Sequence, residues 1–191
     1  MSTATAVEPD AQDELRPPFE ASGEFVDGVW MERTMGNEAA EIASELQIEM
    51  GLHNRQHRLG HIVGSVSGFQ YPGLANGHRR HPDAAFIRKD KVPGDKLSKG
   101  WDAFPPTVVV EVVSPHDSAG EVEKKIEEWL SGGVERVWVV YPESEHIAVH
   151  YPDLHSVTLT ETGTLDGEDV FPGFRMKVAS IFPPFPRDEA K

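Results

Sequence analysis

The chain contains no cysteine among its 191 residues, and it has no apolar run of membrane-spanning length. The first absence excludes disulfide bonds and thiolate metal sites, and it is typical of cytosolic proteins. The second indicates that no segment crosses a membrane, and the N-terminus lacks the charged and then apolar pattern of a signal peptide. We therefore expect a cytoplasmic protein without a membrane partner.

Basic residues are also scarce. The chain has 18 lysine and arginine residues against 32 acidic ones, and its net charge is −14. Such a chain repels phosphates at long range, so broad, non-specific affinity for nucleic acid is not expected, whereas a local basic site remains compatible. A length of 191 residues fits one domain with a substantial core.

The most informative stretch covers residues 107–141 and predicts a strand, a helix and a second strand. Five valines among its first seven residues favour an extended backbone that is apolar on both faces. Ser118 and Glu121 have the spacing of a capping box, and an apolar helical face follows as far as Gly132. A unit of this kind predicts a right-handed parallel crossover.

The other elements complete one domain between residues 18 and 186. Its expected class is α/β, of the α+β type with a mixed sheet. We expect a disordered tail at 1–17 and a short tail at 187–191. Asp27-Gly28 is typical of a hairpin turn, and an apolar stripe predicts a helix over about residues 37–50 that ends at Gly51. Strands are predicted at 61–66, 84–88, 146–151 and 157–160, and a short pair at 168–177.

Glu111 interrupts the valine-rich strand. A carboxylate inside a buried strand is costly unless a metal ion or a cation compensates it. Asp83 follows Pro82 where the chain enters the strand at 84–88, so the two carboxylates converge if these strands are neighbours. Converging carboxylates form a hard-oxygen site for Mg²⁺ or Mn²⁺. The alternatives are structural. Taken alone, Asp83 is better explained as a turn residue, and an ion pair with a cation explains Glu111 as well as a metal does.

A lysine on the following helix is the third candidate. A helical wheel places Lys125 on the flank of the apolar stripe, with its stem directed along the sheet toward Glu111. The same wheel places Lys124 on the solvent side. The alternative is an ordinary surface pair between Lys125 and Glu121, which are four positions apart.

These residues are part of a longer pattern that resembles a known family. Pro82-Asp83, EVVSPHD at 111–117 and the stretch at 123–143 have the order and spacing of the Uma-type family of restriction endonucleases. That family belongs to the PD-(D/E)XK nuclease superfamily. GEFVDGVWME at 23–32 and the closing DVFPGFRMKVASIF at 169–182 extend the resemblance over nearly the whole domain.

The resemblance implies a restriction-endonuclease-like core of helix, three strands, helix and strand, with added antiparallel strands. It implies Asp83 and Glu111 as catalytic ligands of Mg²⁺ or Mn²⁺. The usual superfamily lysine position, two residues after the glutamate, is occupied by Val113, and the family instead places the lysine at Lys125. Family members often show an acid where Ser67 stands here. A further superfamily acid has four candidates: Glu24, Glu38, Glu41 and Glu45.

The activity that the resemblance implies is metal-dependent hydrolysis of DNA phosphodiester bonds. A metal polarises the phosphate and lowers the pKa of a bound water, and a nearby lysine orients that water or stabilises developing charge. One alternative is a nuclease fold without turnover that acts as a binding or regulatory module, which Ser67 and the acidic charge favour. Another is a structural domain that forms a homodimer through exposed edge strands.

Two further patterns bear on partners. The segment Arg79–Lys99 contains seven basic residues and three acidic ones, so its local charge of +4 predicts contact with DNA beside the metal site. The alternative is a solvated lysine-rich loop. His53 with His57, and His78 with His81, have spacings that suit a transition metal, but without a third ligand we favour surface histidines.

Overall fold

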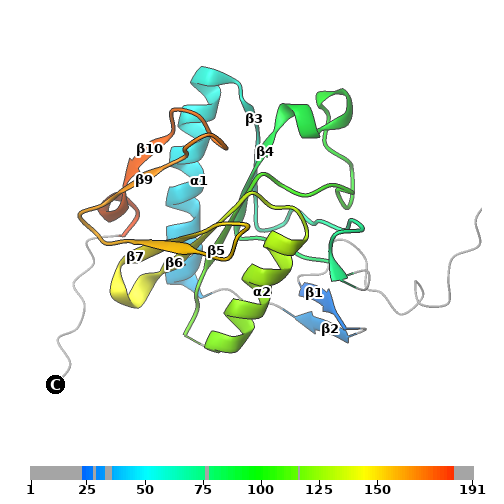
Figure 1. Ribbon diagram of the computed structural model, residues 1–191, viewed down its shortest axis with the longest axis horizontal. Helices are drawn as coiled ribbons and strands as arrows, with labels where there is room; N and C mark the ends of the chain where they lie inside the picture. The colour runs from blue at the N-terminus through cyan, green and yellow to red at the C-terminus, as the bar shows by residue number, and fades with distance from the viewer. Residues whose placement is uncertain (1–22, 28, 33–35, 76–77, 116, 183–191) are drawn as a thin grey trace, which may run out of the picture.

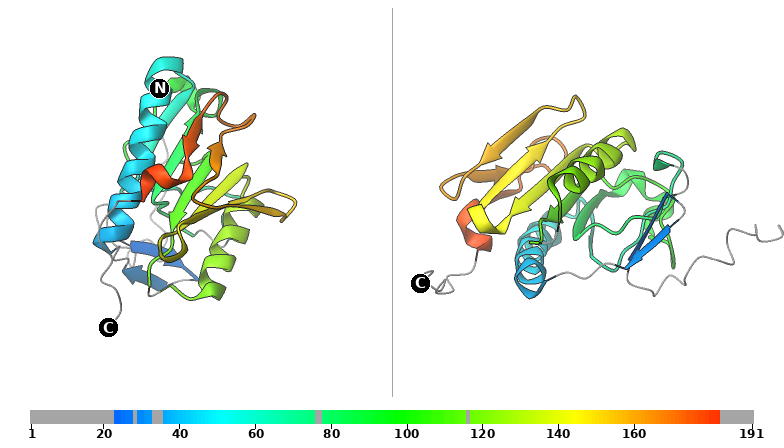
Figure 2. Two further views of the ribbon diagram at one scale, coloured as in Figure 1. Left: turned by 90° about the vertical axis from the view of Figure 1, so that its left-hand side faces the viewer. Right: turned by 90° about the horizontal axis from the view of Figure 1, so that it is seen from below.

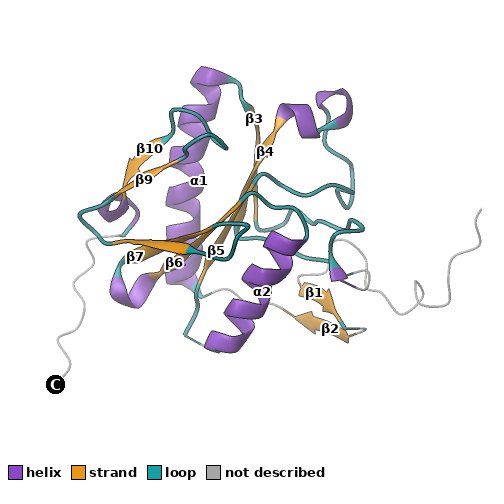
Figure 3. Cartoon of the chain, viewed as in Figure 1, coloured by secondary structure: helices purple, strands orange, loops and turns teal. Residues whose placement is uncertain are grey.

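The computed structural model describes residues 23–27, 29–32, 36–75, 78–115 and 117–182 (Figure 1). They form a six-stranded sheet with a long helix on each face, together with two small two-stranded sheets (Figures 2 and 3). The tails predicted at 1–17 and 187–191 lie outside the described residues. Among the described helices, none is both long and apolar enough to cross a membrane.

The central sheet contains six strands in chain order: β3 (Gly60–Gly64), β4 (Ala84–Arg88), β5 (Val108–Val112), β6 (Arg136–Tyr141), β7 (His146–His150) and β8 (Ser156–Leu159). β5 and β6 are parallel, and the other neighbouring pairs are antiparallel. Helix α2 (Ala119–Ser131) connects the parallel pair, so the predicted strand, helix and parallel strand are confirmed, and the right-handed sense of the crossover stays a prediction. Single-turn 3₁₀ helices occupy η2 (Lys89–Lys91), η3 (Pro93–Asp95), η4 (Pro142–Ser144) and η5 (Val178–Ile181).

Each face of the sheet has its own core because side chains alternate along the strands. Helix α1 (Asn37–His57) packs on one face against Phe86, Val108 and Val110. Helix α2 packs on the other face, where its fully buried Trp129 meets Val109. Glu111, two positions after Val109, therefore belongs to the α2 face.

Helix α1 is longer than the sequence predicts. Its predicted buried stripe from Ala39 to Met50 is confirmed, but the helix continues through Gly51 to His57 and ends at Arg58. A glycine inside a helix costs only about 1 kcal/mol. The additional turns are held by tertiary contact, since the ring of His53 lies 5.0 Å from that of Phe171. Gly51 as a helix end is therefore wrong.

The small sheets attach to the two ends of the domain. β1 (Gly23–Val26) and β2 (Val29–Glu32) form the predicted hairpin, whose Gly28 lies outside the described residues. Phe25 and Arg79 exchange backbone hydrogen bonds of 3.1 and 3.0 Å, which fasten this hairpin to the segment before β4. β9 (Thr164–Asp166) pairs with β10 (Arg175–Lys177), so the first strand of this pair precedes the predicted range.

Candidate active site

Glu111 lies at the contact between β5 and α2. One carboxylate oxygen, Oε2, accepts a hydrogen bond from Lys125 Nζ at 2.9 Å, and Oε1 accepts one from Trp129 Nε1 at 2.8 Å. Lys125 and Trp129 are four positions apart and share one face of α2. Glu111 is only 6% exposed. The predicted approach of Lys125 to Glu111 is confirmed, and Lys124 is exposed as the wheel predicts.

The start of α2 is fixed locally, which determines which of its residues face the sheet. The Ser118 hydroxyl accepts a hydrogen bond from Glu121 N at 3.3 Å, and Glu121 Oε2 accepts one from Ser118 N at 3.1 Å. This reciprocal pair is the predicted capping box. The hydrogen bond from the Ser118 side chain lowers the pKa of Glu121. A helix that begins at this residue presents Lys125 to Glu111.

Asp83 lies beside β5, next to Glu111. Its Oδ2 accepts a hydrogen bond of 2.6 Å from Val112 N, and its own backbone N–H donates to Val110 O at 3.0 Å. In the antiparallel pair of β4 and β5, Ala84 is opposite Val110. The same register places Asp83, the residue before Ala84, opposite Glu111, the residue after Val110. Asp83 is 1% exposed. The structure thus brings the two predicted carboxylates to adjacent positions, and a metal bridging them stays a prediction.

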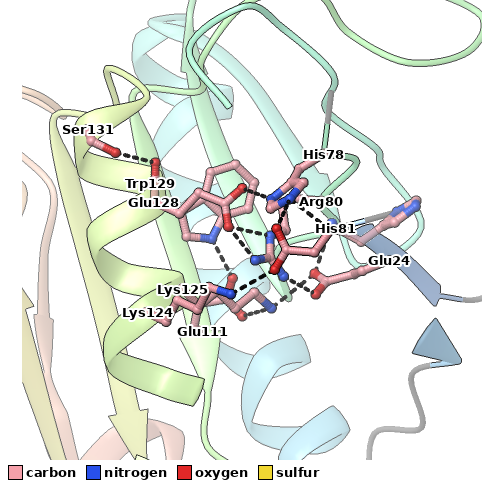
Figure 4. Close-up of polar contacts among 11 residues, drawn as sticks. Glu24, His78, Arg80, His81, Glu111, Lys124, Lys125, Glu128, Trp129 and Ser131 are labelled. Carbon is pink, nitrogen blue, oxygen red and sulfur yellow. Dashed lines mark hydrogen bonds and ion pairs between the residues drawn. The ribbon is translucent and has the colours of Figure 1, made fainter. Parts of the chain in front are cut away.

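A third carboxylate comes from the N-terminal hairpin. Glu24, on β1, contacts Lys125 Nζ through Oε1 at 3.1 Å, and the same oxygen accepts a hydrogen bond from His81 N at 3.2 Å. The ammonium of Lys125 therefore lies between the carboxylates of Glu24 and Glu111 (Figure 4). The other three candidates for the additional acid are exposed on α1: Glu38, Glu41 and Glu45. Glu24 is the candidate that the fold places in the site.

Arg80 and Glu128 extend this cluster, and the sequence reasoning missed both. Arg80 donates a hydrogen bond to Glu24 Oε2 at 2.8 Å. Its Nε donates to Glu128 Oε2 at 3.0 Å, and a second nitrogen of the same guanidinium group makes an ion pair with that oxygen. Burial alone would lower the pKa of Arg80, but the charges of Glu24 and Glu128 more than offset this and raise it. The signal for Glu128 was its position, three residues after Lys125 on the same helix.

His78 and Asp27 close the outer side of the cluster. His78 Nδ1 lies 2.6 Å from Glu128 Oε1, and His78 Nε2 accepts a hydrogen bond from Asp27 N at 2.9 Å. Nε2 also lies 3.1 Å from Asp27 Oδ1. An Nε2 that carries a proton donates to this oxygen, and one without a proton accepts from Asp27 N. Lys124 pairs with Asp27 Oδ2 at 3.0 Å on the surface. We call the following residues the buried network: Glu24, His78, Arg80, Glu111, Lys125, Glu128 and Trp129.

The predicted histidine pairs do not form metal centres. His53 Nε2 hydrogen bonds to Pro172 O at 3.0 Å, and its ring lies 4.3 Å from that of His57. His78 belongs to the buried network and His81 packs on an aromatic ring, so surface exposure is a wrong expectation for this second pair. Across the described residues, no group of three or more His, Cys, Asp or Glu is arranged to hold a metal.

The basic segment Arg79–Lys99 is divided by the fold rather than gathered on one surface. Arg80 is buried in the network. Arg88 pairs with Asp90 at 2.8 Å and with Glu135 at 3.5 Å, and Lys91 also pairs with Glu135 at 2.8 Å. Much of the predicted positive charge is therefore neutralised within the protein. Contact between this segment and DNA stays a prediction.

The chemistry of the donor set fits a hard divalent cation. Glu24, Asp83 and Glu111 offer carboxylate oxygens, and Mg²⁺ is usually held by one or two protein carboxylates with water and substrate phosphate completing its shell. The buried carboxylates, which also include Glu128, outnumber the cations Arg80 and Lys125 by four to two. The formal excess of two negative charges among these six side chains matches one divalent ion. The set does not suit a closed protein cage, in line with the absence of a three-ligand group from the described residues.

Comparisons with known proteins bear on the family and the fold of the chain. The family model Uma2, described as "Putative restriction endonuclease", matches residues 16–179. No curated protein matches the chain. The structure resembles the crystal structure of "a putative nuclease belonging to DUF820" from Anabaena variabilis ATCC 29413, with a TM-score of 0.74. The two chains are 18% identical, and the match covers 91% of this chain and 98% of the other. At that identity the likeness shows the fold, and it confirms the restriction-endonuclease-like α/β core.

Proposed function

Because the chain belongs to the Uma2 family, we propose that it is a metal-dependent DNA endonuclease that hydrolyses phosphodiester bonds with Asp83, Glu111 and Lys125 as its catalytic residues. One observation carries the proposal. The ammonium of Lys125 is held between two buried carboxylates, 2.9 Å from Glu111 and 3.1 Å from Glu24, beside Asp83 at the start of β4. Three acids and a lysine in this arrangement have the composition that metal-assisted phosphodiester hydrolysis requires.

Asp83 and Glu111 are the residues that would hold Mg²⁺ or Mn²⁺, with Glu24 as an additional acid. A bound divalent ion would supply Lewis-acid polarisation of the phosphate and a water of lowered pKa. The protein positions these ligands before any substrate arrives. Val112 N–H orients the Asp83 carboxylate, and the Trp129 indole N–H orients that of Glu111.

Lys125 has a donor available for the reaction. An ammonium carries three N–H groups, and two of them are directed at Glu24 Oε1 and Glu111 Oε2. The third is left to contact an attacking water or a non-bridging phosphate oxygen, where it would stabilise the developing negative charge. The Lys125 side chain is 15% exposed, so part of it is in contact with solvent.

Cleavage of supercoiled plasmid DNA by the purified protein tests the proposal. We expect nicking in Mg²⁺ and none in chelator. Lys125→Met should lower the rate constant by about 10²–10⁴-fold, as removal of a transition-state donor or proton-transfer group does. Lys124→Met is the matched control, since Lys124 makes its ion pair with the exposed Asp27 and the variant should keep full activity. Equal rates for the two variants would contradict the proposed role of Lys125.

A nuclease fold that binds metal or DNA without turnover is the second candidate. The observation in its favour is that both carboxylate oxygens of Glu111 already have protein donors and both of Glu24 do as well. Ser67, where family members often have an acid, lies half-buried in the turn after β3. This candidate predicts a Mg²⁺-dependent rise in melting temperature without plasmid nicking at any Mg²⁺ concentration.

A further inference from the structure

A basic cavity lies at the end of β4 that is remote from Asp83. Its volume is about 380 Å³. It is lined by Arg55 and Arg58 at the end of α1 and by Lys89, which directly follows β4. These segments meet at the top of the view in Figure 1, whereas α2 and β1, which carry four residues of the buried network, lie in its lower half. The cavity is therefore separate from the candidate active site.

The backbone beneath these cations is held by hydrogen bonds. The Asn54 side chain accepts from Leu59 N and Gly60 N at 3.1 Å each, and it donates to Gly60 O at 2.9 Å. Lys89 N donates to Leu59 O at 3.1 Å, which joins the two segments. Gly60 is required here, because a Cβ would lie 2.0 Å from a backbone oxygen of β4. These hydrogen bonds hold the backbone of Arg58 and of Lys89 in defined positions.

The lining of the cavity is net positive, with three cations against one acid. Arg55, Arg58 and Lys89 make no ion pair or side-chain hydrogen bond with the described residues, and the acid that lines the cavity, Asp95, contacts His61 Nε2 at 2.9 Å. The negative dipole at the C-terminus of α1 accounts for cations on that helix. It does not account for Lys89, which comes from a different element.

We propose that this cavity binds a phosphate group of a nucleic-acid backbone at a distance from the scissile phosphate. The inference rests on the proposed nuclease function and adds a second contact with the same substrate. Guanidinium groups match phosphate oxygens in a bidentate geometry, and the lysine adds a point charge. Strand β4 separates Asp83 from Lys89 by about 20 Å, which is about six base-pair steps of a duplex. A short duplex is therefore long enough to reach from one region to the other.

A contact of this kind contributes to affinity and leaves the chemical step unchanged. The test compares the triple variant Arg55→Gln/Arg58→Gln/Lys89→Gln with the parent. The matched control, Lys124→Gln/Arg175→Gln/Lys177→Gln, removes the same charge from exposed residues outside both the cavity and the Arg79–Lys99 segment. Binding of a fluorescein-labelled duplex is measured in chelator over a series of salt concentrations, and kcat and KM are measured in Mg²⁺.

We expect the cavity variant to bind the duplex about tenfold or more weakly, with a salt dependence shallower by about one unit in the logarithmic slope, because one phosphate contact is lost. Its KM should rise while kcat at saturating DNA stays at the parent value. The control variant should change the slope far less, because its cations share no common site.

Three results would overturn the inference. If both variants lose the same affinity, the effect is one of net charge and the cavity has no special role, while cleavage by the parent still supports the nuclease proposal. If inorganic phosphate raises the melting temperature of the parent but not of the cavity variant, and duplex affinity is equal in both, the ligand is free phosphate. A parent that neither binds nor cleaves the duplex would remove both proposals together.

Discussion

The two ends of strand β4 use the same residue types in opposite ways. At its start, Arg80 and Lys125 are largely buried and each contacts two carboxylates. At its end, Arg55, Arg58 and Lys89 are exposed and have no ionic partner among the described residues. The first arrangement fixes side chains in one geometry, and the second leaves charge available to a ligand. The net charge of −14 therefore says little about either region.

The largest effect that separates the two regions should come from Arg80→Met. The substitution leaves Glu24 and Glu128 buried without their cation, so we expect the free energy of unfolding to fall by about 3–5 kcal/mol. Urea denaturation measures this loss. Arg175→Met is the control, because its pair with Asp166 is exposed and is worth about 0–1 kcal/mol. Similar losses of unfolding free energy in the two variants would show that the ion pairs of Arg80 contribute no more to stability than exposed surface pairs do.

A smaller effect should follow from Trp129→Phe, which keeps most of the ring in the core but removes the N–H that contacts Glu111. Loss of this donor should cost about 1–3 kcal/mol of stability and weaken Mg²⁺ binding by about 10–100-fold. Calorimetric titration with Mg²⁺ measures the second quantity. Trp138→Phe changes the same residue type on the α1 face, where it stacks on Phe174, and should leave metal affinity intact.

The smallest effect concerns the exposed border of the network and depends on pH. A hydrogen bond from Lys124, with another from His78, lowers the pKa of Asp27 below its ordinary value of 3.8. A carboxyl with a lower pKa in the folded state adds stability above its unfolded pKa, and that stability is lost as the pH falls through the folded value. Asp27→Asn should therefore lower the melting temperature slightly at neutral pH, and the difference should vanish in strong acid. A difference that grows on acidification would contradict this assignment.

Local patterns predicted the centre of the molecule well. The valines of β5 favour a strand whatever their surroundings, and Ser118 with Glu121 fixes the start of α2, so a helical wheel was enough to direct Lys125 toward Glu111. The strand, the capping box and the wheel position of Lys125 each depend on residues within about two helical turns of one another, although Lys125 and Glu111 themselves are 14 positions apart. Sequence reasoning succeeds at this range because backbone geometry alone relates the side chains.

The rest of the site depends on contacts between distant segments, which leave no local signature. Glu24 meets His81 across 57 positions, and Arg80 meets Glu128 across 48. The choice of Glu24 among four candidate acids follows only once the β1–β2 hairpin is seen to pack beside α2 (Figure 4). The continuation of α1 past Gly51 had the same origin, since contacts with Phe171 outweigh the helix propensity of one glycine.

The thermal unfolding of Glu111→Gln with chelator and with Mg²⁺ tests most directly whether the buried carboxylates serve chemistry or only structure. In chelator the variant should melt near the parent, because Lys125 keeps its contact with Glu24 and no cation is left alone. Mg²⁺ at 100 times its dissociation constant should stabilise the parent by about 2.7 kcal/mol and the variant hardly at all. A parent whose melting temperature ignores Mg²⁺, together with a variant that melts much earlier, would show that Glu111 is one half of a structural ion pair.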